Sequence, residues 1–319
     1  MGDMKAQILT IASLLTAFSG TLPAVDPRLL DLVMPDAKVF AGVNVAQAKT
    51  TPFGQYVLSQ IQNQAAELDK VTALTGFDPR QDVTELLAAS NAATGQHSGL
   101  ALATGTFNVA TITTFAIEKK AVTETYKNVT ILEDPKQEGG IAFLTANVAV
   151  AGPVAEVKAA IDRQSAPSVL PATVVVQLNN LSSAEDAWVL STVPPSSLHP
   201  PSNTPVIPGV GNGTQNAFNN IQQANAGVKF GSTVALTVQA QADNAQDATQ
   251  VSGVLQLLVN VAQMQATNNA AAAALAKSLT ITTNGTTITI TASMPSDQFQ
   301  QLVQTPHAHA AHSRLEHHN

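Results

Sequence analysis

The segment LTITTNGTTITITASM, residues 279–294, constrains the fold more than any other part of the chain. Threonine and isoleucine alternate on both sides of Asn284-Gly285. Such alternation is typical of a half-buried strand, and Asn-Gly is a preferred pair for a type I′ hairpin turn. The segment therefore predicts an antiparallel hairpin, and the chain must contain a sheet in which this hairpin can pair.

A second hairpin is predicted over residues 139–152, with its turn near Ala146-Asn147. Each hairpin precedes a predicted helix, PVAEVKAAIDR with Pro153 in its first turn and PSDQFQQLV near the C-terminus. The two halves of the chain also open alike, with strands predicted over 36–45 and 186–193. We therefore expect an α+β fold of two tandem pseudo-repeats, each an antiparallel sheet with helices packed on one face.

The boundary between these repeats is predicted at a change in charge. After Ser165 the only strong cations are Lys229, Lys277 and Arg314. The stretch RQSAPSVLPATVVV lies at this change and predicts a linker that leads into a strand. The predicted segments are an N-terminal segment 1–24, a first repeat 25–165, a second repeat 166–304 and a tail 305–319.

Periodicity predicts the remaining elements. Helices are expected over 52–68, 216–223 and 244–266, and an alanine-rich helix is expected to end at Leu279. The stretch GFDPRQDVTELLAAS predicts a turn and a helix, with Asp82 as N-cap and Glu85 three residues later. Further strands are expected over the following ranges: 99–107, 126–134 and 232–242.

Charge and cysteine content exclude several classes of function. Only 12% of the residues are charged, the net charge is −7, and no basic cluster exists beyond Lys119-Lys120. Binding to nucleic acid through phosphate contacts requires clustered cations, so we expect no nucleic-acid partner. The chain has no cysteine, which excludes disulfides and thiolate metal sites, and no cofactor motif is found.

The N-terminus permits two interpretations. Lys5 precedes an apolar stretch over 8–18, and small residues follow with cleavage positions after Gly20 or Ala24. This is the layout of a secretory signal peptide, which predicts an exported protein of the periplasm or cell surface. The alternative is a retained amphipathic helix, because Gln7, Thr10 and Ser13 form a polar stripe. No later run is long and apolar enough to predict a membrane span.

Three segments together carry a family resemblance: LLDLVMPDAKVFAGVNVAQAKTTPFGQYVLSQI, TGFDPRQDVTELLAAS and IAFLTANVAVAGPVAEVKAAID. They resemble a group of uncharacterised exported proteins from acidobacteria and their relatives, over about residues 26–303. The resemblance implies an envelope location and a duplicated α+β fold, and it supplies no activity and no catalytic residues. This chain departs from the group in its histidine-bearing tail and its amide-rich second half.

Few residues suggest catalysis. The loop PGVGNGTQNAFNN, residues 208–220, lacks the Lys-Ser/Thr pair of a P-loop and predicts an exposed loop with Thr214 as a helix N-cap. His97 is a candidate base that Asp78 or Asp82 would orient, and His199 is the other histidine before the tail. The adjacent acids Glu133-Asp134 and Glu185-Asp186 would point to opposite faces of a strand and so would not act as acid and base together.

The tail TPHAHAAHSRLEHHN contains most of the histidines. His307, His309 and His312 are candidate ligands for Zn²⁺, Ni²⁺ or Cu²⁺. Pro306 interrupts the segment, and no carboxylate flanks these three residues to orient them. We therefore expect a flexible tail with weak, adventitious metal affinity.

These observations favour an exported, non-enzymatic protein with a binding, structural or self-assembly role. Its partner would be another protein or a second copy, because the Thr/Ile hairpin has high β-propensity and little charge. One alternative is a hydrolase-like enzyme with a site between the two halves. Another is a carrier that binds a small apolar ligand between helix and sheet.

Overall fold

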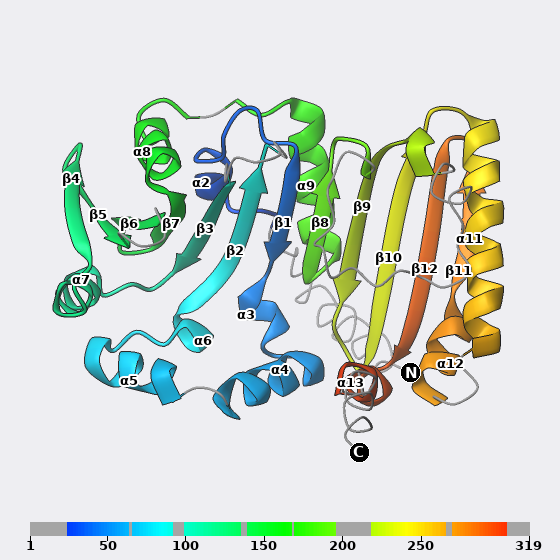
Figure 1. Ribbon diagram of the computed structural model, residues 1–319, viewed down its shortest axis with the longest axis horizontal. Coiled ribbons are helices and arrows are strands. Elements are labelled where there is room, and N and C mark those ends of the chain that lie inside the picture. The colour runs from blue at the N-terminus through cyan, green and yellow to red at the C-terminus, as the bar shows by residue number, and fades with distance from the viewer. Residues whose placement is uncertain are drawn as a thin grey trace, which may run out of the picture.

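The fold was analysed in a computed structural model, which describes residues 24–63, 66–91, 99–134, 139–167, 169–195, 218–265 and 270–304. Its centre is one twelve-stranded antiparallel sheet (Figure 1). The strand order is β11-β12-β10-β9-β8-β1-β2-β3-β7-β6-β5-β4. The α+β class with an antiparallel sheet, predicted from the sequence, is confirmed.

The first half contributes seven strands and seven helices to the described part of the chain. The strands are β1 Val39–Val43, β2 Val83–Ser90, β3 Gly99–Gly105, β4 Val122–Tyr126, β5 Val129–Asp134, β6 Gly139–Thr145 and β7 Val148–Pro153. The helices are α2 Pro27–Leu30, α3 Val45–Ala48, α4 Pro52–Asn63, α5 Ala66–Thr75, α6 Pro79–Asp82, α7 Val109–Glu118 and α8 Val154–Arg163.

The second half contributes the other end of the sheet. Its strands are β8 Ala187–Ser191, β9 Ile221–Lys229, β10 Thr233–Ala242, β11 Thr280–Asn284 and β12 Thr287–Pro295. Its helices are α9 Ala172–Ala184, the 3-10 turn η2 Phe218–Asn220, α11 Ala245–Gln265, α12 Ala270–Ser278 and α13 Ser296–Gln304. No helix in the described ranges combines the length and apolarity that crossing a membrane requires.

The two halves join at a seam between their first strands. β1 pairs with β8 in antiparallel register, and Phe40 lies opposite Leu190. Each half ends in a hairpin and a helix, β6-β7-α8 in the first and β11-β12-α13 in the second. The predicted boundary at 165/166 falls in the link between α8 and α9. A duplication, with its residue boundaries, stays a prediction.

The register divides the sheet into two faces. We call the side that carries Phe40, Leu87, Leu102 and Leu190 the α9 face, because Leu178 of α9 packs into the same core. The α9 face changes from apolar to polar between β8 and β9: Leu190 lies opposite Asn225 of β9, which lies opposite Gln239 of β10. The apolar core on this face therefore extends through the first half as far as β8 and α9, and the α9 face of β9 and β10 is polar.

The core of the second half lies on the opposite side, which we call the α11 face. Val251 of α11 packs there with Ile221 and Ile288 of the sheet. In the first half, α7 covers part of the same face, with Ile112 near Ala103 and Phe143. Helices thus cover both sides of the sheet, although the main core of each half has one face.

Three predicted elements were wrong in whole or in part, the third being the helix expected over 216–223, whose last three residues belong to strand β9. Residues 83–90 form strand β2 and not a helix, because Val83, Leu87 and Ala89 are buried while β1 and β3 pair on either side. The true N-cap of the preceding short helix α6 is Asp78. Residues 172–184 form helix α9 and not a strand.

The C-terminal hairpin was predicted correctly, but its turn is displaced by one residue. Asn284 pairs with Thr287, so the two-residue loop is Gly285-Thr286 and not Asn284-Gly285. Gly285 has φ +59°, a conformation that glycine adopts without the steric cost of a Cβ atom. Positive φ at the first loop position is typical of a type II′ turn.

Candidate functional site beside helix α9

The histidines singled out in the sequence all lie outside the described residues. These are His97 and His199 together with the tail residues His307, His309 and His312. The hydrolase and metal-tail hypotheses that depend on them stay predictions. Within the described ranges, no group of three or more histidine, aspartate or glutamate side chains is arranged to hold a metal ion.

Asp78 and Asp82, the candidate partners of His97, stabilise the turn before β2. The carboxylate of Asp78 accepts hydrogen bonds from the Arg80 backbone N–H at 3.0 Å and from Arg80 Nε at 2.7 Å. This guanidinium holds the pKa of Asp78 below its usual value. Asp82 Oδ2 accepts a hydrogen bond from the backbone N–H of Asp78 at 2.7 Å. Both carboxylates are therefore occupied by the local chain.

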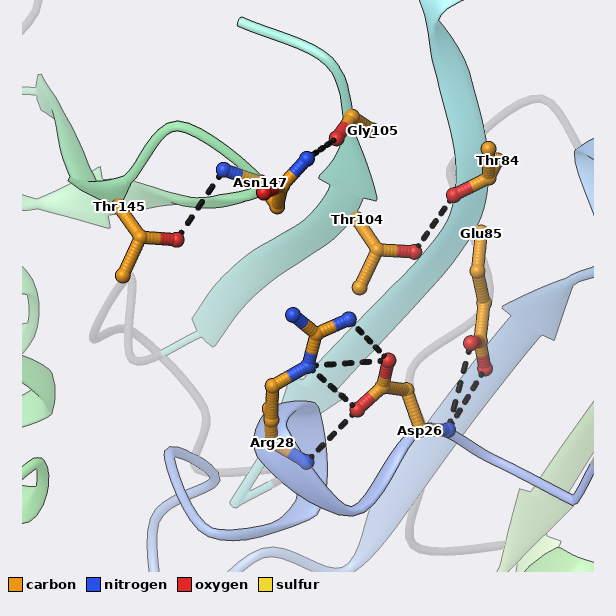
Figure 2. Close-up of polar contacts among 8 residues, drawn as sticks. All are labelled: Asp26, Arg28, Thr84, Glu85, Thr104, Gly105, Thr145 and Asn147. Atoms are coloured by element: carbon orange, nitrogen blue, oxygen red, sulfur yellow. Dashed lines mark hydrogen bonds and ion pairs between the residues drawn. The ribbon is translucent and has the colours of Figure 1, made fainter.

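A small polar pocket lies on the α9 face at the seam, and we call it the seam pocket. It has a volume of about 220 Å³, and residues from both halves line it: Asp26, Arg28, Val43, Asn44, Ala46, Thr84, Glu85, Thr104, Ser182 and Trp188. Figure 2 shows the Arg28 side chain directed to the Asp26 carboxylate, and the backbone nitrogen of Asp26 directed to the carboxylate of Glu85 of β2. Asp26 caps α2 and binds Arg28 through both carboxylate oxygens, with Oδ2 at 2.6 Å from Nη2.

Glu85 is the unusual residue of the seam pocket. The backbone N–H of Asp26 faces its carboxylate at 3.4 Å from Oε1 and 3.3 Å from Oε2. Burial raises the pKa of Glu85 to about 7, although the Asp26 N–H and the charge of Arg28 favour the ionised form. A carboxyl group with a pKa near neutrality exchanges its proton in the physiological range, which marks a candidate functional position.

Hydrogen bonds hold the neighbouring strand ends in place (Figure 2). The hydroxyls of Thr84 and Thr104 lie 2.8 Å apart across β2 and β3. Asn147 Nδ2 donates to the carbonyl of Gly105 at 2.8 Å, and its backbone N–H donates to Thr145 Oγ1 at 3.1 Å. The β6–β7 turn is therefore fixed to the end of β3. The seam pocket offers an acid that exchanges its proton, while the hydroxyls of Thr84 and Thr104 bond each other and that of Ser182 donates to the Asn179 carbonyl at 3.4 Å.

A larger depression lies on the other side of α9, over the polar strands of the second half. We call it the amide groove. It has a volume of about 360 Å³, and its lining residues are Gln177, Asn180, Leu181, Ala184, Glu185, Gln223, Ala224, Asn225, Gly227, Thr237, Gln239, Ala240, Gln241 and Thr287. Five of its Gln and Asn side chains, those of residues 177, 180, 223, 225 and 239, make no hydrogen bond to any part of the chain that the structure describes.

The register places these amides in rows. Asn225 lies directly opposite Gln239, and Gln223 lies opposite Gln241. Gln241 is held in place because its Nε2 donates to Thr286 Oγ1 at 2.6 Å. Neighbouring strands are about 4.8 Å apart, and residues on one face repeat about every 6.8 Å along a strand. The groove therefore presents a regular array of paired donors and acceptors.

One carboxylate, that of Glu185, enters the amide groove. Its side chain crosses over Gly227, where an added Cβ atom would lie 2.2 Å from Glu185 Cγ. Burial raises the pKa of Glu185, and the repulsion of Asp186 adds to this rise, while Lys229 opposes it. The adjacent Asp186 does not line the groove and is fully buried, where its carboxylate binds Lys229 and the Phe230 backbone N–H. The two adjacent carboxylates therefore lie in different environments, Glu185 in the groove and Asp186 in the protein interior.

The amide groove was not found from the sequence. Its residues come from α9 and three strands, and β9 was predicted in part as a helix. A signal was nevertheless present, since Thr237, Gln239 and Gln241 alternate with Val238 and Ala240. That alternation predicts a strand with one fully polar face, and such a face needs explanation when a helix lies over it.

Comparison with known proteins supports the fold alone. The chain matches no known protein family, and no curated protein matches it. Its structure is similar to crystal form III of TP0453, with 10% sequence identity, a TM-score of 0.53, and coverage of 86% of this chain and 96% of that chain. Crystal form IV of TP0453 is similar with a TM-score of 0.50 and 10% identity, over 91% of this chain and 99% of that chain.

Proposed function

We propose that this protein is an exported, non-enzymatic binding protein whose amide groove takes a neutral, polyhydroxylated ligand of the glycan class. The single observation that carries the proposal is the set of five unpaired amide side chains directed to one 360 Å³ groove. The signal-like N-terminus and the resemblance to envelope proteins support export.

The lining of the groove selects the class of ligand. An amide offers both a donor and an acceptor, as does each hydroxyl of a sugar. A strongly charged ligand would favour fixed opposite charges, and here Glu185 is the one ionisable lining residue. An apolar ligand would favour a mainly apolar wall with few polar groups. Rows of amides on neighbouring strands instead match repeated hydroxyls along a chain of neutral sugars.

The test is a titration of the full chain with soluble maltohexaose, cellohexaose and chitohexaose, followed by calorimetry. We expect at least one of them to bind. Replacing Asn225 and Gln239 together by alanine removes one facing pair and should weaken that binding by at least about tenfold, since each lost hydrogen bond contributes about 1 kcal/mol.

Gln256→Ala is the matched control, because Gln256 is an exposed amide on α11 and does not line the groove. This variant should bind like the wild type. Failure of all three sugars to bind at millimolar concentration, or equal weakening by Gln256→Ala, would show that the proposal is wrong.

A second candidate function rests on a separate cavity. Between α11 and the hairpin β11-β12 lies a space of about 290 Å³ lined only by aliphatic side chains: Leu255, Leu258, Val259, Val261, Ala262, Leu279, Ile281 and Ile290. This lining favours the carriage of a small apolar ligand between helix and sheet. Replacing Val259 by Phe should fill the space and displace 1-anilinonaphthalene-8-sulfonate, whereas Asn225→Ala should leave that dye bound.

A further inference from the structure

The two ends of the sheet differ in their protection against pairing with another chain. β4 and β11 are its edge strands, at opposite ends of the molecule (Figure 1). Glu124 of β4 binds Lys158 at 2.7 Å, and Lys127 beyond this strand binds Asp162 at 2.6 Å. Charged side chains on an edge oppose pairing with another strand, because they would be desolvated in the new sheet.

β11 has no such protection. Its sequence, TITTN, contains no charge and no proline, and four of its five residues are exposed. In the part of the chain that the structure describes, β11 pairs only with β12. Its other edge therefore presents unpaired backbone donors and acceptors, and strands of this kind add readily to a further strand.

We infer that β11 pairs with β11 of a second copy of this chain, in antiparallel register, to form a homodimer with one continuous sheet. A second copy is the occupant that the chemistry favours. The strand is uncharged, and it is rich in β-branched threonine and isoleucine, so it meets its own sequence without like-charge repulsion and with good β-propensity.

The helix beside this edge supports the same partner. Two antiparallel strands related by a twofold axis keep the same face of the sheet on the same side. The α11 helix packs on β11, so the α11 helices of both copies would flank the new junction on one side.

The outer surface of α11 carries the apolar groups that such a contact would cover. Leu257 is 59% exposed and Met264 is 68% exposed. They are seven residues apart and so lie on one face of the helix. Exposed side chains of this size beside an unprotected edge are a second, independent feature that dimerisation would explain.

The experiment is sedimentation velocity on the full chain over a range of concentrations. The wild type is expected to sediment at twice the chain mass of 33.0 kDa. Thr282→Lys places a charge on the exposed β11 edge and should raise the dimer dissociation constant at least tenfold. Thr125→Lys is the matched control, because it adds the same charge at an exposed position of the opposite edge strand.

The helix contact has its own variant. Replacing Leu257 and Met264 together by glutamate should also dissociate the dimer, with an unchanged far-ultraviolet circular dichroism spectrum. A monomeric wild type at 100 µM would overturn the inference, as would a dimer that Thr125→Lys dissociates and Thr282→Lys does not. Sugar binding by the amide groove is measured separately, so the two proposals can fail independently.

Discussion

Asp186 and Lys229 form an ion pair of 3.1 Å in which the Asp186 side chain has no exposure to solvent. The second oxygen of this carboxylate accepts the backbone N–H of Phe230 at 2.6 Å. The pair joins the start of β8 to the end of β9, next in the chain to Glu185 and close to Gly227, which line the amide groove. It therefore fixes the position of the strands that carry the amides.

Replacing Asp186 by alanine should lower the free energy of unfolding by about 3 kcal/mol, because the Phe230 N–H loses its acceptor and Lys229 loses its partner. Urea unfolding measures the change. Asp69→Ala is the control, since Asp69 pairs with Arg80 at 2.9 Å but is 63% exposed, and its loss should cost less than about 1 kcal/mol. An equal decrease in unfolding free energy in the two variants would contradict the prediction that the buried ion pair contributes more than the exposed one.

Glu85 should make stability depend on pH. Its folded-state pKa of about 7 lies above the unfolded value near 4.5, so the folded state holds the proton more tightly between these values. Stability from this group is complete below pH 4.5 and is lost as the pH rises through 7. Glu85→Gln should therefore reduce the decrease in unfolding free energy between low and high pH by about 1–2 kcal/mol, after allowance for solvent screening.

Urea unfolding at pH 5 and pH 8 tests the prediction for Glu85. Glu118→Gln, on the exposed end of α7, is the matched control and should keep the slope of the wild type. A slope that Glu85→Gln leaves unchanged would assign the pH dependence to another group.

Glu185 and Gly227 should show strong energetic coupling. Gly227→Ala forces the added methyl group against Glu185 Cγ and should destabilise the protein by about 1–3 kcal/mol. Adding Glu185→Ala removes the two nearest obstructing atoms, Cγ and Cδ, and leaves only Cβ at 3.0 Å, so the double variant should be more stable than Gly227→Ala alone. A double-mutant cycle from thermal unfolding gives the coupling energy, and a value near zero would mean that the two residues do not compete for this space.

Two glycines should respond to alanine in opposite directions. Gly285→Ala places a Cβ atom at φ +59° and should cost about 1–2 kcal/mol. Gly253→Ala lies inside α11, with no atom within 4 Å of the new Cβ, and should stabilise the protein by about 0.5–1 kcal/mol. Chemical unfolding of both variants measures the contrast. Stabilisation by Gly285→Ala would show that the turn has a different conformation.

Local patterns were sufficient for the hairpins. The 139–153 and 280–295 segments carry alternation and turn chemistry within a few residues, and both form in the structure. β2 was predicted as a helix because Glu85, Leu86, Leu87 and the alanines favour helix. Its pairing with β1 and β3, which begin more than 40 residues before it and 16 after it, overrides that preference.

The opposite error at α9 has the same cause. Val174, Val175 and Val176 favour a strand by their branching. In the structure Val174 and Val175 pack against the core of the α9 face, while Val176 is 57% exposed, a distribution that follows the turn of a helix. The seam pocket and the amide groove depend on such distant contacts, as between Asp26 and Glu85, 59 residues apart. The spacing of apolar and polar residues within a short stretch of sequence cannot detect contacts between residues so far apart.

The pairing of β1 with β8 also imposes a delay during biosynthesis, because β8 is synthesised long after β1. Phe40 and Leu190 are opposite each other but 150 positions apart (190 minus 40). At about 5–20 residues per second, the ribosome needs roughly 8–30 s to make the intervening chain. During that interval the edge of β1 that will pair with β8 has unpaired backbone groups. The nascent polypeptide must therefore be kept from associating with other chains until β8 has been synthesised.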